Sequence, residues 1–136
     1  MAETESPQAE TKPFLRRGED FESLYANWVY FQPSEWDVRT FFGEVDNDPD
    51  GNAFIALHTS VALPWLQAKL AHYYLTLQLA IYEMKHGQIA IPDLVRPPEP
   101  DKPEGILEGD PYAIKVYEFV KKIREEFLSQ SGRFSY

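Results

Sequence analysis

The sequence predicts an α+β domain in which a three-stranded antiparallel sheet packs on one long helix, followed by a C-terminal amphipathic helix on a proline-rich tether. Three observations lead to this prediction. Three segments rich in aromatic and β-branched residues follow one another with short polar connections. A stretch of about 22 residues, free of internal proline and glycine, comes next. A second helical pattern follows a run of prolines.

The expected strands cover residues 25–31, 36–45 and 53–61. Residues 33–35 supply turn chemistry, and residues 46–52 form a long polar loop. Alternation along the second strand places one set of side chains on a common face, namely Trp36, Val38, Thr40 and Phe42. The third strand is apolar on both faces, which suits a central strand or one covered on both sides. Three consecutive strands with short links predict an antiparallel meander.

The long helix is bounded by Pro64, which suits a first helical turn, and by Gly87, which suits a left-handed C-terminal cap. At 100° per residue the helix carries two apolar stripes. The wider stripe runs from Leu63 to Met84, and the second consists of Ala68, Ala71, Leu75, Leu79 and Tyr82. A helix with two apolar faces needs two neighbours, and one sheet covers only one. The second stripe is therefore expected to meet the C-terminal helix or another subunit.

After the long helix, residues 88–95 are apolar but contain Pro92, so they suit a short edge strand or an extended arm. Residues 96–109 hold four prolines and predict a stiff, extended linker. Asp110 and Pro111 then provide the N-cap and first position of a helix that ends near residue 130. Its apolar positions form a single seam: Tyr112, Val116, Phe119, Val120, Ile123 and Phe127.

Charge and composition exclude several classes of function. The chain has 136 residues and a formal net charge of −9, which disfavours binding to nucleic acid or to anionic lipid. It has no cysteine, so disulfides, thiolate nucleophiles and cysteine-ligated metals are excluded. The polar, acidic residues 1–21 predict a disordered tail rather than a secretory signal, and no segment suits a membrane span. We therefore expect a cytoplasmic protein without cofactor, organised as this tail, a domain over 22–95, a linker over 96–109 and a helix over 110–130.

The strongest local motif is an alternation of carboxylates, Asp46, Asp48 and Asp50, followed by Gly51. This spacing matches the first half of a calcium loop, but the twelfth position is Leu57 instead of glutamate. An acidic hairpin loop and a weak calcium site both remain open. The three histidines, near Ser60 or on the long helix, show no spacing that demands catalysis, so no catalytic residue is assigned; they are His58, His72 and His86.

Two pairs of segments carry a resemblance to a known family. They are Tyr25–Val29 with Trp36–Glu44, and Leu63–Leu70 with Ile81–Ile89. Together they resemble a family of short bacterial and archaeal proteins known only as a domain of unknown function. The resemblance covers about residues 25–91 and implies a β-β-β-α unit without an established activity. In outline alone, the order of elements is also similar to SecB-like export chaperones, which bind unfolded chains along apolar grooves.

These observations predict a non-catalytic, homo-oligomeric interaction or assembly subunit that contacts itself, as a homodimer or larger, and another protein through the C-terminal helix. The expected interface residues are Leu75, Leu79, Tyr82, Tyr112, Val116, Phe119, Ile123 and Phe127. A SecB-like holdase and a weak calcium-binding module are the alternatives.

Overall fold

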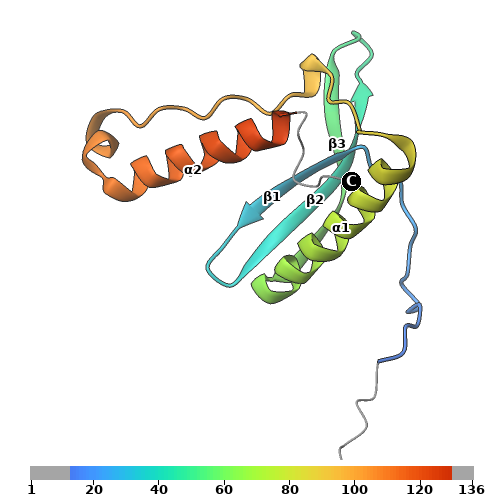
Figure 1. The fold of residues 1–136 in the computed structure, drawn as a ribbon. Coiled ribbons are helices and arrows are strands. Elements are labelled where there is room, and N and C mark those ends of the chain that lie inside the picture. Colours follow the sequence, from blue (N-terminus) through green and yellow to red (C-terminus); the bar gives the residue numbers. More distant parts are fainter. Residues whose placement is uncertain (1–12, 130–136) are drawn as a thin grey trace, which may run out of the picture. The chain divides into compact units, whose positions relative to one another are not determined.

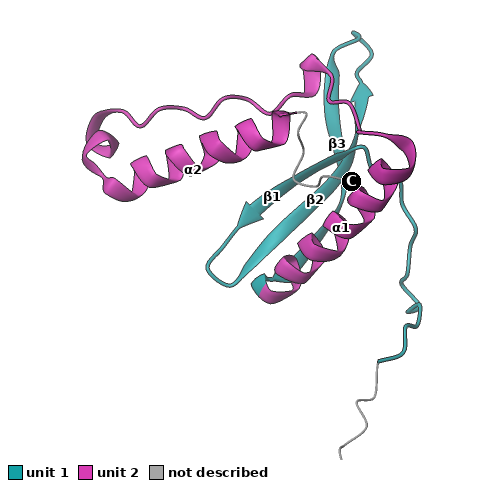
Figure 2. Cartoon of the chain, viewed as in Figure 1, with its two compact units in different colours: residues 1–65 teal, residues 66–136 magenta. Residues whose placement is uncertain are grey.

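The computed structural model describes residues 13–129 and has the predicted α+β class (Figure 1). A three-stranded antiparallel sheet comes first, a long helix follows it, and a C-terminal helix begins at Pro111. The chain divides into two compact units, residues 1–65 and residues 66–136 (Figure 2). Of the predicted tail, residues 1–12 lie outside the described part, and residues 13–21 contain neither helix nor strand.

The first unit contains the sheet, in the order β1-β2-β3. The three strands are β1 (Trp28–Pro33), β2 (Asp37–Asn47) and β3 (Ala53–Pro64). Both neighbouring pairs are antiparallel, so the predicted meander is confirmed. Of the two positions that the sequence left open for the third strand, the central one is excluded, because β3 is an edge strand and β2 is central. Apolar residues on both faces of β3 therefore indicate two faces that need cover, not a position between two strands.

The turn between β1 and β2 is organised by Ser34. Its hydroxyl accepts the backbone N–H of Asp37 at 3.1 Å and donates to the Asp37 carboxylate at 2.8 Å. The indole N–H of Trp65 donates to the Ser34 carbonyl at 3.1 Å. Trp36 was expected on one face of the second strand, but it lies in this turn and is 79% exposed. The turn hydrogen bonds delay the start of β2 to Asp37, which removes Trp36 from the strand face.

One face of the sheet holds the most deeply buried side chains. Val38 and Thr40 on β2 are 7% and 5% exposed, and they alternate along the strand as predicted. Phe31 of β1 and Val61 of β3 flank Thr40 in the ladder. Among the described residues, Thr40 Oγ1 is a buried polar atom without a hydrogen-bond partner.

The second unit contains both helices. Helix α1 (Trp65–His86) begins one residue later than expected, because Pro64 closes β3. Gly87 ends the helix with φ +87°, and its N–H donates to the Glu83 carbonyl at 2.8 Å. No residue of α1 is buried. Both apolar stripes of α1 therefore retain accessible surface in this chain.

After α1 the chain has no further strand up to residue 129, so residues 88–95 form an arm ending in the 3₁₀ turn η1 (Asp93–Val95). A second turn, η2 (Gly105–Gly109), interrupts the predicted linker. Helix α2 (Pro111–Leu128) starts as predicted, because the Asp110 carboxylate accepts the N–H of Tyr112 at 2.9 Å.

Candidate functional site

A β-bulge between β2 and β3 explains the positions of Gly43 and His58 in the first unit. The pairing of β2 with β3 shifts between Phe42 and Gly43, which leaves His58 as the extra residue on β3. Gly43 is required there, because a Cβ atom at this position would lie 2.5 Å from the carbonyl oxygen of Ala56. The bulge therefore depends on a residue without a side chain.

The segment before β1 is tied to this bulge. The N–H of Asn27 donates to the Gly43 carbonyl at 3.0 Å, and Asn27 Oδ1 accepts the N–H of Val45 at 2.9 Å. The Asn27 side chain thus continues the ladder where the β1 backbone turns away, which is why β1 begins at Trp28 and not at residue 25. Asn27 and Gly43, two residues of the resemblance motif, have structural roles here.

His58 uses both ring nitrogens within the same cluster. Nε2 lies 2.9 Å from the Tyr25 carbonyl and Nδ1 lies 2.8 Å from Thr59 Oγ1. A carbonyl only accepts, so Nε2 donates to Tyr25, and in that tautomer Nδ1 accepts the threonine hydroxyl. This arrangement anchors Tyr25 to β3, and it does not pair His58 with a carboxylate in the manner of a catalytic base.

The acidic motif forms the hairpin loop between β2 and β3. Asp48 Oδ1 accepts the N–H groups of Asp50 and Asn52 at 3.0 and 2.8 Å, and Gly51 adopts φ +82°. Asp46 caps the neighbouring residue in the same way, through the N–H of Asn47 at 2.8 Å. Over residues 13–129, no group of three or more histidine, aspartate or glutamate side chains is placed to hold a metal ion.

The C-terminal part of the second unit is a hairpin between an extended segment and a helix. We call residues 97–128 the C-terminal hairpin. Every third residue of its extended arm is half-buried, namely Pro97, Pro100 and Pro103, while the residues between them are exposed. A repeat of three is that of polyproline II, which rises ~3.1 Å per residue. The three prolines therefore form one stripe about 19 Å long.

The matching stripe on α2 is its less exposed face. Its half-buried residues are Ala113, Tyr117, Arg124 and Leu128. Arg124 donates from Nε to the Pro97 carbonyl at 2.9 Å, and its Nη1 lies 3.8 Å from Glu99. From Ala113 to Arg124 the helix rises about 17 Å, close to the length of the proline stripe. The extended arm thus covers one side of α2.

The apolar seam of α2 is a different face. We define the α2 seam as the apolar positions that the sequence predicts, namely Tyr112, Val116, Phe119, Val120, Ile123 and Phe127. At 100° per residue its centre lies roughly 100° around the helix from the side that the prolines contact. The seam residues keep exposed fractions from 36% at Ile123 to 74% at Tyr112. The prolines therefore leave much of this face exposed, although Tyr112 and Val116 lie beside the arm near Pro103.

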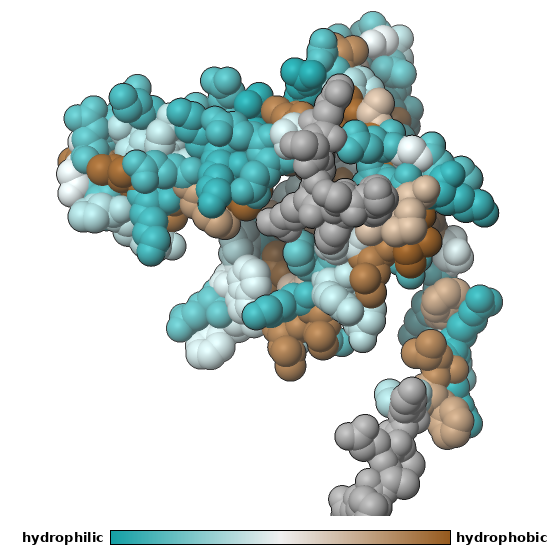
Figure 3. Space-filling view, viewed as in Figure 1, coloured by the Kyte–Doolittle hydropathy of each residue, from teal (hydrophilic) through white to brown (hydrophobic). Residues whose placement is uncertain are grey.

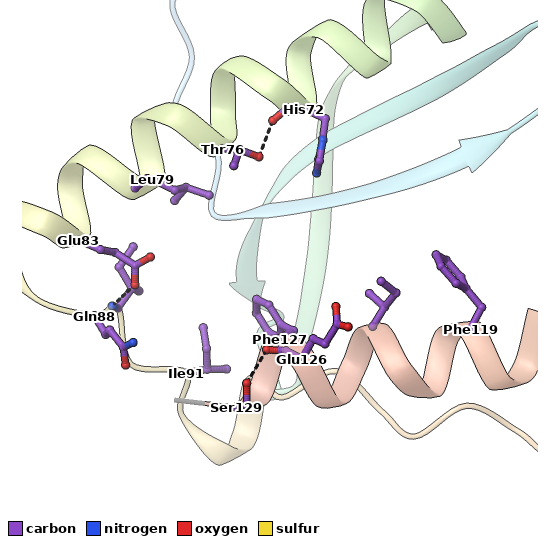
Figure 4. A pocket seen from close by; sticks show the side chains of 13 residues that line it. His72, Thr76, Leu79, Glu83, Gln88, Ile91, Phe119, Glu126, Phe127 and Ser129 are labelled. Carbon is purple, nitrogen blue, oxygen red and sulfur yellow. Dashed lines mark hydrogen bonds between the residues drawn. The ribbon is translucent and has the colours of Figure 1, made fainter. Parts of the chain in front are cut away.

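A groove of about 690 Å³ lies in the second unit beside this seam (Figure 4). Phe119 and Phe127 of α2 line it together with Leu79 of α1 and Ile91 of the arm. Glu83 also lines the groove and accepts the N–H of Ile89 at 2.9 Å, which fixes the arm to the end of α1. The groove brings Leu79 of the second α1 stripe and the C-terminal half of the α2 seam to one hollow, together with the polar α1 residues His72, Thr76 and Glu83.

Of the eight predicted interface residues, four line this groove or its rim: Leu79, Phe119, Ile123 and Phe127. Tyr112 and Val116 lie toward the η2 end of α2, where they face the extended arm near Pro103. Leu75 and Tyr82 are 61% and 53% exposed on α1. In the view of Figure 3, hydrophobic residues gather over α1, whereas α2 presents mostly hydrophilic residues.

Sequence reasoning missed two features of these surfaces. The proline stripe was detectable, since prolines at 97, 100 and 103 repeat every three residues. Nothing in the sequence pointed to the cluster of Asn27, Gly43 and His58 at the bulge, apart from the presence of Asn27 and Gly43 in the resemblance segments. Among the described residues, no helix is long and apolar enough to cross a membrane. Comparison of the chain with protein-family models, curated proteins and solved structures gives no match.

Proposed function

We propose that this chain is a non-catalytic, homo-oligomeric interaction or assembly subunit. The observation that supports the proposal is that its two helices each present apolar residues to solvent. No residue of α1 or α2 is buried, although both carry stripes of large apolar side chains. Apolar patches larger than a few hundred Å² are rare on soluble monomers and mark interaction sites.

The chemistry of the surface supports binding over catalysis. His58, the histidine closest to hydroxyl residues in the sequence, is held by Tyr25 and Thr59 in a structural role. The acidic loop uses Asp48 to hold its own backbone. The features that remain are the apolar second stripe of α1, the apolar α2 seam, and the groove that Leu79 shares with this seam.

The native mass in solution tests this proposal. Light scattering on a size-exclusion column should give twice 15.8 kDa or more. Replacing Leu79 by glutamate should lower that mass, because the charge would have to be buried in an interface. Gln78→Glu is the matched control, since it adds the same charge one residue away on the polar side of the helix. A monomeric wild-type chain at high micromolar concentration would overturn the proposal.

A holdase chaperone is the second candidate, and the groove favours it. An open hollow lined by Leu79, Ile91 and Phe119 suits an extended apolar segment of an unfolded client. The test is suppression of light scattering by an aggregating client protein at equimolar subunit. No suppression at a several-fold excess would remove this candidate and leave the assembly role in place.

A further inference from the structure

We propose that residues 130–136, the segment that follows α2, fold back over the groove of the second unit and close it within the same chain. This inference goes beyond the proposed function and does not depend on the oligomeric state. Three features lead to it: the place where α2 ends, the lining of the groove, and the residues that follow Ser129 in the sequence. The segment itself lies outside the described residues, 13–129.

Helix α2 ends at the groove. Its C-cap, Ser129, has extended backbone angles, φ −70° and ψ 133°, and is itself one of the residues that line the groove. The Ser129 hydroxyl donates to the Glu126 carbonyl at 3.0 Å, which holds this end of the helix in place. Phe127, in the last turn of α2, also lines the groove (Figure 4). The residues that follow Ser129 therefore start beside the hollow.

The groove combines apolar surface with acidic groups. Phe119, Phe127 and Leu79 line it and are 62%, 54% and 44% exposed, so the described residues leave this apolar surface partly uncovered. Besides these, the described lining includes the carboxylates of Glu83 and Glu126 and contains neither lysine nor arginine. One carboxylate comes from each helix, and Figure 4 shows both side chains at the hollow. A complementary occupant has large apolar side chains and a positive charge.

The sequence after Ser129 has this composition. Residues 130–136 contain one arginine and two aromatic residues, and they contain no acidic residue. In an extended segment alternate side chains point the same way, so Phe134 and Tyr136 share one side. Both aromatic rings then face the apolar lining together. Arg133 supplies the positive charge that the two carboxylates attract.

The length of the segment matches the length of the groove. From Phe119 to Phe127 the groove runs along α2 for about 12 Å. The Ser-Gly pair at 131–132 is a common turn dipeptide, and glycine allows the left-handed backbone that many tight turns require. The four residues after it, 133–136, span about 13 Å when extended. A single turn after α2 therefore lays the aromatic residues along the groove.

Attachment beside the groove favours this segment over other occupants. A short tether gives an effective concentration in the millimolar range, which a free partner at micromolar concentration does not reach. The same segment of a second copy therefore competes poorly with the segment already attached. Residues 130–136 act as a lid, which an extended apolar client or a partner helix has to displace before it can enter the groove.

A spin label on the segment tests its position, because the native chain has no cysteine that would also react. We would label full-length Ser135→Cys and record the amide signals of the ¹⁵N-labelled protein by NMR. The amides of Thr76, Leu79 and Phe119 should lose most of their intensity, and they should regain it when the label is chemically reduced. Phe119 lies about 15 Å along α2 from Ser129, so attachment alone does not bring the label there.

Two sets of variants test which side chains hold the segment. The matched control carries the same label together with Phe134→Ser and Tyr136→Ser. It keeps the tether and loses the aromatic rings, so the groove amides should keep most of their intensity. Arg133→Glu should have the same effect, because a third negative charge would lie beside the two carboxylates of the groove. Arg133→Lys retains the positive charge and should leave the loss of intensity unchanged.

A mixed sample decides whether one chain or two are involved. Spin-labelled protein without ¹⁵N, added to ¹⁵N-labelled protein without the spin label, should leave the groove amides unaffected. A strong loss of intensity in this mixture would overturn closure within one chain, because the label would then come from a second copy.

Two other results would refute the docking itself. One is full intensity of the groove amides in labelled Ser135→Cys. The other is an undiminished loss after both aromatic residues are replaced, since the tether alone would then explain it. None of these outcomes depends on the native mass, so the proposed oligomeric function is tested separately.

Discussion

Replacing Gly43 by alanine tests the bulge on which the sheet depends. The new Cβ would lie 2.5 Å from the Ala56 carbonyl oxygen and 3.1 Å from both the Ala56 carbonyl carbon and the Leu57 Cα. All three are backbone atoms of β3, so no side chain can turn aside to make room. Overpacking that forces a backbone shift costs about 1–3 kcal/mol. We expect the free energy of unfolding to fall by that amount.

Urea denaturation followed by tryptophan fluorescence measures this loss, with all variants at one protein concentration because an oligomer's stability depends on it. The melting temperature should fall by roughly 3–10 °C. Gly109→Ala is the matched control, since its Cβ would meet nothing within 4 Å and the backbone there does not have positive φ. Its stability should change by less than about 0.5 kcal/mol or rise slightly. Equal stability of Gly43→Ala and wild type would refute the bulge and the pairing derived from it.

Further predictions concern single positions in both units. Thr40→Val should raise the free energy of unfolding by about 1 kcal/mol, because it removes a buried hydroxyl that has no partner among the described residues; a loss of stability in urea would contradict this. Asp110→Ala should cost α2 about 1 kcal/mol through the lost cap on Tyr112, measured as faster amide hydrogen exchange in the first turn. Gly87→Ala should destabilise the end of α1 by about 1–2 kcal/mol, since φ is +87° there, and unchanged exchange near that cap would count against it. Millimolar calcium should leave the melting temperature unchanged relative to EDTA, because Asp48 already accepts hydrogen bonds from its own loop. A rise of several degrees would instead support calcium binding at this loop.

Local chemistry was sufficient to predict most of the elements. Asp110 and Pro111 located the start of α2, and Gly87 located the end of α1, because caps depend on a few adjacent residues. Turn residues separated the three strands for the same reason. The two errors have different causes. Trp36 leaves β2 because the local turn hydrogen bonds of Ser34 hold it outside the strand. β1 starts late because Asn27 bonds to Val45, 18 residues away, across the sheet.

The edge position of β3 shows a similar limit. The apolar residues on both faces of β3 indicate that both faces need to be covered. They do not indicate which strands lie beside β3 in the sheet. The calcium-like motif had the right spacing of carboxylates, yet their direction depends on how the hairpin closes. In the folded loop Asp48 points to backbone N–H groups, which local spacing cannot reveal.

Periodicity and neighbouring residues were enough to predict the α+β class, the order of the elements, the end of α1, the start of α2 and the apolar seam of α2. Which side of α2 is covered could be seen only in the folded chain. Pro97 and Arg124 are 27 residues apart, and only folding of the hairpin brings them into contact. The proline arm takes the side next to the seam, and Phe119 and Phe127 of the seam keep more than half of their surface exposed.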